Sequence, residues 1–309
     1  MKKPLAAIVC CAFAVVLIVS CSTQPKKTDT VSTVKNQAAQ DAATGDSYVR
    51  QGRYDLAIQF LTLSLGEYTS IDDTEGVIQV YNALGKSYIA MGSLGMAQDI
   101  LLKAALLARG AKPSFLFVTT LNLGELYLAK GDAEAARATF EAALAMPADS
   151  RSSAQTAILY HDLGTAAKNL GDPDKALAYY GKALEINLAS KLTEQAASDY
   201  YMIASVHSLD GRYDDAIRNA TLALTLDKQI EDSRAIAKDL HALGLIASKK
   251  GDAAAAFEYF QRAYLVFTTL GLKADMKRSL TGLIGAADSL GRTAEADAYR
   301  KTLADLGTP

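Results

Sequence analysis

The sequence predicts an all-α fold, a right-handed α-solenoid of about seven helix-turn-helix units. The first observation is a set of seven glycines spaced 39 or 40 residues apart. The second is an alanine five residues after each glycine. Recurrence at a period of ~20–50 residues is typical of stacked repeats. The glycines are Gly52, Gly92, Gly131, Gly171, Gly211, Gly251 and Gly291, and the alanines are Ala57, Ala97, Ala136, Ala176, Ala216, Ala256 and Ala296.

The residues around each glycine predict one helix before it and a second helix after it. Similar residues recur seven and four positions before the glycine, and nine and twelve positions after it. Offsets of three, four and seven residues fall on one face of a helix. Glycine suits the turn because the residue past a helix C-terminus is commonly left-handed. The next residue is expected to cap the second helix at Ser93, Asp132, Asp172 and Asp252.

Small residues seven positions before the glycines predict a close crossing of the two helices in each unit. They are Gly45, Gly85, Gly124, Gly164, Ala204 and Gly244. A helix pair cannot bury its apolar face alone, so the units must stack on one another. In the last unit Ile284 and Arg300 break the pattern, and the helix expected from Thr293 is polar on much of its surface. Because terminal repeats need a solvated outer face, this unit is expected to cap the solenoid.

These residues resemble the tetratricopeptide repeat (TPR). The family's pattern is a large residue, Leu-Gly, Tyr, Gly-x-Tyr, Ala, Phe and Ala at set spacings, and residues 81–97, 121–136 and 160–176 fit it closely. The resemblance covers about residues 38–306. The usual TPR period is about 34 residues, whereas the period here is 40. In this respect the chain is similar to the longer-helix TPR subclass of kinesin light chains and several bacterial regulators, which implies longer helices and a broader groove.

The amino terminus predicts a secretory signal. Lys2 and Lys3 precede an apolar run over residues 5–19, which is shorter than a membrane-spanning helix requires. The run ends in Ile-Val-Ser-Cys at residues 18–21, which is similar to the lipobox of bacterial lipoproteins. That resemblance implies cleavage after residue 20 and lipid, including palmitate, on Cys21. The alternatives are an uncleaved signal anchor, or a plain signal peptide with an incidental cysteine.

The sequence thus divides into four parts. Residues 1–20 are the expected lipoprotein signal peptide, and residues 21–36 the lipidated cysteine with a polar, flexible tether. The solenoid is expected over residues 37–306 and a short tail over 307–309. Ser22 follows the cysteine where aspartate would favour inner-membrane retention. By resemblance to enterobacterial sorting, this favours the outer membrane, with the domain in the periplasm.

Composition excludes several classes of function. All three cysteines lie within the first 21 residues, so the mature domain has no disulfide and no cysteine-based metal site. The net charge of −2 argues against a nucleic-acid binder. The sequence shows no metal-binding or catalytic motif, and the neighbours His161 and Asp162 do not face each other on a helix. We therefore expect no cofactor, no metal and no enzymatic activity.

The TPR resemblance implies that the first helix of each unit lines a concave groove. The family's groove positions, carried over residue by residue, include Asn82, Lys86, Leu121, Glu125, His161, Lys168, Asn169, Tyr201, His241 and Lys249. Such a strip can hold a peptide, with Asn82 and Asn169 bonding its backbone and Tyr201 as an aromatic anchor. The family's carboxylate clamp is not expected, because Asn82 and Lys86 stand in the opposite order. A solvated helix face is the simpler reading of any one of these residues.

The expected function is a non-catalytic scaffold that is lipid-anchored and faces the periplasm. It would bind envelope proteins or peptides in the concave groove during assembly of an envelope complex. The alternative is an accessory lipoprotein of a transport system, in which Val118, Leu121 and Leu128 line a cavity for a small apolar molecule. Pairing of the solenoid ends would give a homo-oligomer.

Overall fold

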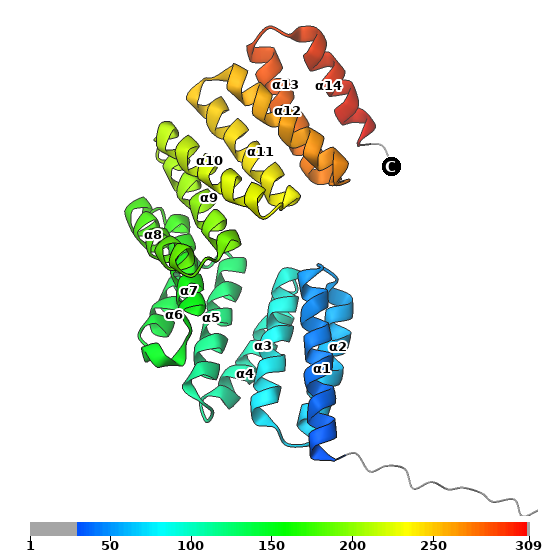
Figure 1. Ribbon diagram of the computed structural model, residues 1–309, viewed down its shortest axis with the longest axis vertical. Coiled ribbons are helices and arrows are strands. Elements are labelled where there is room, and N and C mark those ends of the chain that lie inside the picture. The colour runs from blue at the N-terminus through cyan, green and yellow to red at the C-terminus, as the bar shows by residue number, and fades with distance from the viewer. Residues whose placement is uncertain (1–29, 308–309) are drawn as a thin grey trace, which may run out of the picture.

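The computed structural model describes residues 30–307, which form fourteen α-helices, one short 3-10 helix and no strand. The α-helices follow one another as seven antiparallel pairs (Figure 1). The pairs are α1 (Val31–Arg50) with α2 (Tyr54–Ser70), α3 (Thr74–Ala90) with α4 (Leu94–Ala108), α5 (Pro113–Ala129) with α6 (Ala133–Leu144), α7 (Ser153–Asn169) with α8 (Pro173–Ala189), α9 (Thr193–Leu209) with α10 (Tyr213–Gln229), α11 (Ser233–Lys250) with α12 (Ala253–Thr269), and α13 (Lys273–Ser289) with α14 (Thr293–Asp305). The predicted seven-unit helical solenoid is confirmed.

The turn inside each unit forms as the glycines predict. All seven repeat glycines adopt left-handed φ angles, from 69° at Gly291 to 87° at Gly251. The carboxylates of Asp132, Asp172 and Asp252 accept hydrogen bonds from the backbone three residues on, at 3.0–3.1 Å. Ser93 occupies the same cap position, but its side chain makes no capping bond. Three of the four predicted caps are therefore confirmed, and the prediction for Ser93 is wrong.

The two helices of a unit cross where the small residues lie. The alanines five residues after the turn glycines are all fully buried. A Cβ added at Gly124 would lie 2.2 Å from Cε1 of Phe140, and one added at Gly164 would lie 2.8 Å from the Tyr180 ring. Each glycine thus accommodates the large side chain sixteen residues later in its own unit. In the fifth unit both members are small, since Ala204 is matched by the buried Ala220.

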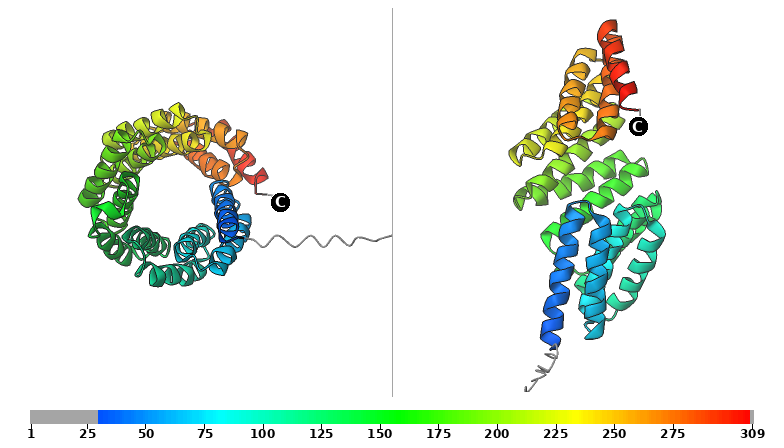
Figure 2. Two further views of the ribbon diagram at one scale, coloured as in Figure 1. Left: turned by 60° about the horizontal axis from the view of Figure 1, so that its bottom comes forward. Right: turned by 90° about the vertical axis from the view of Figure 1, so that its right-hand side faces the viewer.

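The stacked units wind around a common axis. In projection the helices curl around a central opening, and a second view separates α1 from α14 along the long axis (Figure 2). Consecutive first helices touch across every unit boundary except the one between α9 and α11, as α3 and α5 do, whereas consecutive second helices of the described chain make no comparable contact. Elements on the concave side of a curved stack approach more closely than those outside. The first helices therefore form the inner face.

The amino-terminal boundary of the solenoid differs from the prediction. Helix α1 begins at Val31, six residues before the expected start at residue 37, and Thr30 caps it by accepting from the N–H of Thr33. The first turns of α1 are mostly polar, and only Val31 and Val34 precede Ala38 on an apolar face. They are anchored by an ion pair from Lys35 to Asp73, with 2.6 Å between Nζ and Oδ2. The signal peptide and Cys21 lie outside the described residues.

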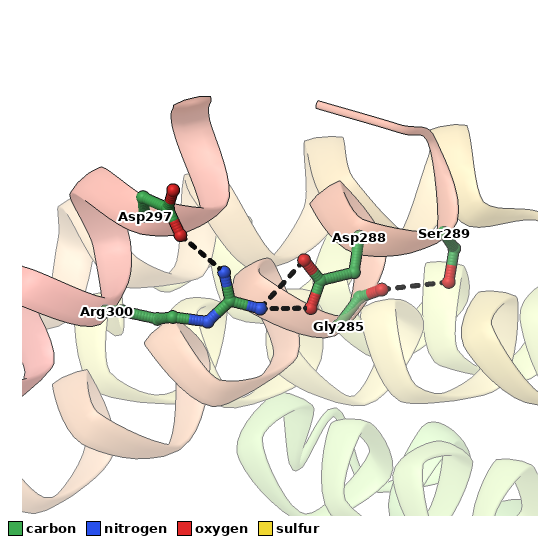
Figure 3. A network of polar contacts seen from close by, with 5 residues as sticks. All are labelled: Gly285, Asp288, Ser289, Asp297 and Arg300. Atoms are coloured by element: carbon green, nitrogen blue, oxygen red, sulfur yellow. Dashed lines mark hydrogen bonds and ion pairs between the residues drawn. The ribbon is translucent and has the colours of Figure 1, made fainter. Parts of the chain in front are cut away.

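The last unit ends the stack as a polar cap. Only Ala296 of α14 is fully buried, and the rest of the helix is largely solvated. Arg300 stands where five of the other six units carry a large apolar residue, but its guanidinium contacts Asp288 and Asp297 (Figure 3). The nitrogen–oxygen distances are 2.6 Å to Asp288 Oδ2 and 2.8 Å to Asp297 Oδ1. The break in pattern at Arg300 is thus a surface ion-pair network that joins α13 to α14.

Candidate inner-face binding site

The inner face carries the side chains that were assigned to the groove, but several are used between units. Asn82 is only 5% exposed. Its Nδ2 donates to Thr119 Oγ1 on α5 at 2.9 Å, and its Oδ1 accepts from Asn122 Nδ2 at 2.9 Å. Its amide is therefore occupied by the next unit and cannot bond a peptide backbone, so the role assigned to Asn82 is corrected.

Leu121 is also unavailable to a partner. It is 5% exposed and belongs to the core formed by α5, α6 and α7, and Val118 and Leu128 pack against the same core. Leu121 packs into this core because the adjacent helix α7 covers it. The role of Leu121 in the groove is corrected, and the apolar lining proposed for a small ligand is core packing instead.

His161 joins the fourth unit to the fifth. Its Nδ1 lies 2.7 Å from Oδ1 of the fully buried Asp199 on α9, and the other carboxylate oxygen accepts from Asn187 Nδ2 at 2.7 Å. Because an ionised carboxylate only accepts, the imidazole donates from Nδ1. Asp199 is thus satisfied by two donors from the preceding unit.

The same inter-unit position recurs along the chain. His241 Nδ1 lies 3.1 Å from Ser279 Oγ, 38 residues on, and Asn82 contacts Thr119 in the equivalent place. Burial, followed by the positive charge of Arg278, lowers the pKa of His241. Because this contact recurs at three unit boundaries, we infer that these side chains join consecutive units. The pair His161–Asp199 therefore belongs to this series of inter-unit contacts.

A charged cluster lies on the inner face of α3, α5 and α7. Lys86 Nζ is 3.7 Å from Glu125 Oε1, and the two side chains are 53% and 22% exposed. Asp162 Oδ2 is buried and accepts no hydrogen bond. Burial, then the charge of Glu125, raises the pKa of Asp162 well above its ordinary value, and Lys86 opposes this rise. Lys86 thus pairs with Glu125, and its positive charge also acts on the nearby Asp162.

The remaining candidates reach solvent. Tyr201 is 36% exposed near the middle of α9. Asn169 and Lys249 are exposed at the C-terminal ends of α7 and α11, and burial lowers the pKa of the partly covered Lys168. A cation near a helix C-terminus is stabilised by the helix dipole. The accessible part of the predicted groove consists of Lys86, Lys168, Asn169, Tyr201 and Lys249.

A cavity of about 620 Å³ opens between α9 and α11, which are the consecutive first helices without substantial mutual contact. The predicted residues Tyr201 and His241 line it, as do two buried carboxyl residues that sequence reasoning missed, Asp227 and Asp239. Its volume is that of a ligand-binding pocket. Aligning the units at their 40-residue period would have revealed these acids, because they stand where Asn187 and Asp199 stand one unit earlier.

Two further classes of site find no support in the described part of the chain. Across residues 30–307 no group of His, Cys, Asp and Glu side chains is arranged to hold a metal ion. Within the same range, no helix combines the length and the apolar character needed to cross a bilayer.

Sequence comparison identifies the family. One family model described as tetratricopeptide repeat matches residues 116–189 and 194–269, and a second such model matches residues 78–110. The chain is a tetratricopeptide-repeat protein. No curated protein sequence matches it.

Solved structures share the fold of this tetratricopeptide-repeat chain at low sequence identity. The apo form of RapI is 10% identical with a TM-score of 0.73, covering 87% of this chain and 76% of that one. The apo quorum sensor NprR from B. thuringiensis is 18% identical with a TM-score of 0.69, covering 89% and 77%. A Rap protein complexed with competence and sporulation factor is 14% identical with a TM-score of 0.64, covering 88% and 77%. These similarities establish the solenoid fold.

Proposed function

We propose that this chain is a non-catalytic scaffold that binds a segment of a partner protein along its inner face. The observation that carries the proposal is the row of first helices along the inner face, which presents exposed Lys86, Tyr201 and Lys249, with a cavity beside Tyr201. Helical solenoids use such concave surfaces for extended partners. The solved Rap complex with competence and sporulation factor and the quorum sensor NprR support a binding role for this fold.

The absence of a catalytic role is part of the proposal. The His161–Asp199 pair repeats a structural contact seen at other unit boundaries. Ser198 lines the small cavity beside this pair, but no hydrogen bond joins its hydroxyl to the imidazole. A nucleophile needs a base within hydrogen-bond reach. The geometry here supplies an inter-unit link and no activated nucleophile.

We propose that the scaffold lies at the outer membrane of the bacterial cell envelope, anchored through lipid on Cys21 with its solenoid in the periplasm. The support is the layout of residues 1–21, with two lysines, an apolar run and the Ile-Val-Ser-Cys ending. Cys21→Ser should abolish palmitate labelling and release the protein from membranes. Continued labelling of this variant would remove the lipoprotein assignment without affecting the binding proposal.

Charge reversal on the inner face tests the binding role. In Lys86→Glu combined with Lys249→Glu, two exposed cations of the row become anions, and one of them faces Glu125. We expect weaker co-purification of partner proteins and unchanged helicity by circular dichroism. A matched control is Lys103→Glu with Lys182→Glu, which reverses two exposed lysines on the second helices α4 and α8. Equal capture by the two double variants would contradict an inner-face site.

A further inference from the structure

The unit boundary after α10 carries two carboxyl groups where the preceding boundary carries a matched pair. Asp227 stands 40 residues after Asn187, and Asp239 stands 40 residues after Asp199. The histidine that completes the earlier contact, His161, is replaced by Tyr201. Both N–H donors that satisfy Asp199 are therefore missing around Asp239.

The consequence is a buried acid pair without a counter-charge in contact. Asp239 is 2% exposed and Asp227 is 6% exposed. The Oδ2 atom of Asp239 accepts no hydrogen bond from the described protein. Burial first, and then the charge of Asp227, raises the pKa of Asp239 to about 8, and burial also raises the pKa of Asp227. Two such groups share a proton or attract a cation, because two buried anions in contact are strongly unfavourable.

Both acids line the cavity between α9 and α11. The charged groups that surround them come from three elements and are all more exposed than the two acids. Glu194 comes from α9 and Arg278 from α13. The others belong to α11 and its cap, and they are Asp232, Arg234, Lys238 and His241. Arg278 is already engaged by Asp275 on its own helix, and the side chains of Arg234 and Lys238 are solvent-exposed. The interior of the cavity is therefore acidic.

We propose that this cavity receives a cationic side chain, the ammonium of a lysine or the guanidinium of an arginine, from a partner segment on the inner face. Such a group supplies the N–H donors that Asn187 and His161 supply one unit earlier, and it adds a positive charge. Charge-assisted hydrogen bonds to carboxylates are the stronger kind. Tyr201, at the edge of the cavity, would cover the methylene stem. This inference rests on the proposed function and names its partner chemistry.

The test uses the full chain and four capped tripeptides, Ac-Ala-X-Ala-NH2 with X as Lys, Arg, Leu or Glu. Binding is followed through the NMR amide signals of Ser198 and Ala235, which line the cavity. We expect the Lys and Arg peptides to bind at least about tenfold more tightly than the Leu and Glu peptides. Binding of the Lys peptide should release the shared proton, so its affinity should rise several-fold from about pH 6 to about pH 9.

Two variants locate the effect. Asp227→Asn restores the amide–carboxylate pair of the preceding boundary and Asp239→Asn removes the central acid, and each should weaken Lys-peptide binding about tenfold or more. The exposed Asp174→Asn on α8 is the matched control and should change nothing. Asp227→Asn is expected to fold at least as stably as the parent chain, which thermal melting by circular dichroism verifies.

Three results would overturn the inference: no tripeptide shifts the cavity signals, the Leu peptide matches the Lys peptide, or Asp227→Asn binds the Lys peptide undiminished. The proposed function fails separately. If partner capture depends on Lys86 and Lys249 while the cavity shows no preference for cations, the scaffold stands without this pocket. If the Lys peptide binds at the two acids while partner capture is unchanged by reversing Lys86 and Lys249, the cation pocket is supported and the inner-face scaffold is contradicted.

Discussion

The side-chain amide of Asn187 donates to Asp199 across the boundary between the fourth and fifth units, with Nδ2 2.7 Å from Oδ2. The same two positions one unit later hold Asp227 and Asp239. A repeat protein thus contains its own reference state for an unusual site. Asn187 supplies Asp199 with an N–H donor, and Asp227 supplies Asp239 with a second carboxyl group instead.

Asp227→Asn should stabilise the fold in the absence of any partner. The new amide can donate to Asp239, so a buried oxygen without a hydrogen bond gains a donor, which is worth about 1–3 kcal/mol. Urea denaturation at neutral pH measures the change in the free energy of unfolding, with Asp174→Asn as the control. A loss of stability in Asp227→Asn would show that the two carboxyls are already well satisfied.

The gain from Asp227→Asn should depend on pH. The folded-state pKa of Asp239, about 8, lies above its ordinary value of 3.8, so the folded chain holds a proton that the unfolded chain has released. The stabilising effect of that proton is complete below the ordinary pKa and is lost as pH rises through the folded value. The stability difference between the variant and the parent chain should therefore be larger at about pH 8 than at about pH 5. A constant difference across this range would mean that Asp239 titrates normally.

Gly124→Ala and Gly181→Ala should have opposite effects on stability. A Cβ at Gly124 would collide with the Phe140 ring, whereas a Cβ at the exposed Gly181 on α8 meets nothing within 4 Å. Overpacking typically costs about 1–3 kcal/mol. Removing glycine from an open helical position typically gains about 0.5–1 kcal/mol. Thermal melting compares the two, and a shift of the same sign in both would contradict the crossing geometry.

The turns between units hold strain that a glycine should relieve. Lys191 adopts a left-handed φ of 57°, and the equivalent turn two units later uses Gly271 at 67°. A left-handed side-chain-bearing residue costs roughly 1–2 kcal/mol, part of which the flexibility of glycine in the unfolded chain offsets. Lys191→Gly should therefore raise the melting temperature slightly and Gly271→Lys should lower it. Gly271→Lys melting above the parent chain would refute this account of the turns.

The helix pairs were predictable because their determinants are local. Turn glycines such as Gly131, caps such as Asp132 and small crossing residues such as Gly124 each act within one unit, so one repeat reveals them. The roles of Asn82 and Leu121 were mispredicted because burial at this position depends on how far each unit rotates against the next. The rotation between consecutive units depends on the whole stack, so it cannot be predicted from the sequence of one repeat.

The acid pair and the start of α1 were missed for different reasons. Asp227 and Asp239 are twelve residues apart on different helices, and only comparison with Asn187 and Asp199 makes them conspicuous. Val31 begins a helix whose first turns are mostly polar and solvated, and their two valines, Val31 and Val34, give only a weak apolar period. Its signals are the cap Thr30 and the ion pair of Lys35 with Asp73, a residue on the next unit.

Site-specific photo-crosslinking in native membranes tests the central claim, that a partner protein binds the inner face, most directly. A benzophenone amino acid replaces either Tyr201 on α9 or Leu222 on the second helix α10, which are 36% and 44% exposed. The account predicts partner adducts from position 201 and few from position 222. Equal adducts at both positions, or adducts from position 222 alone, would contradict it.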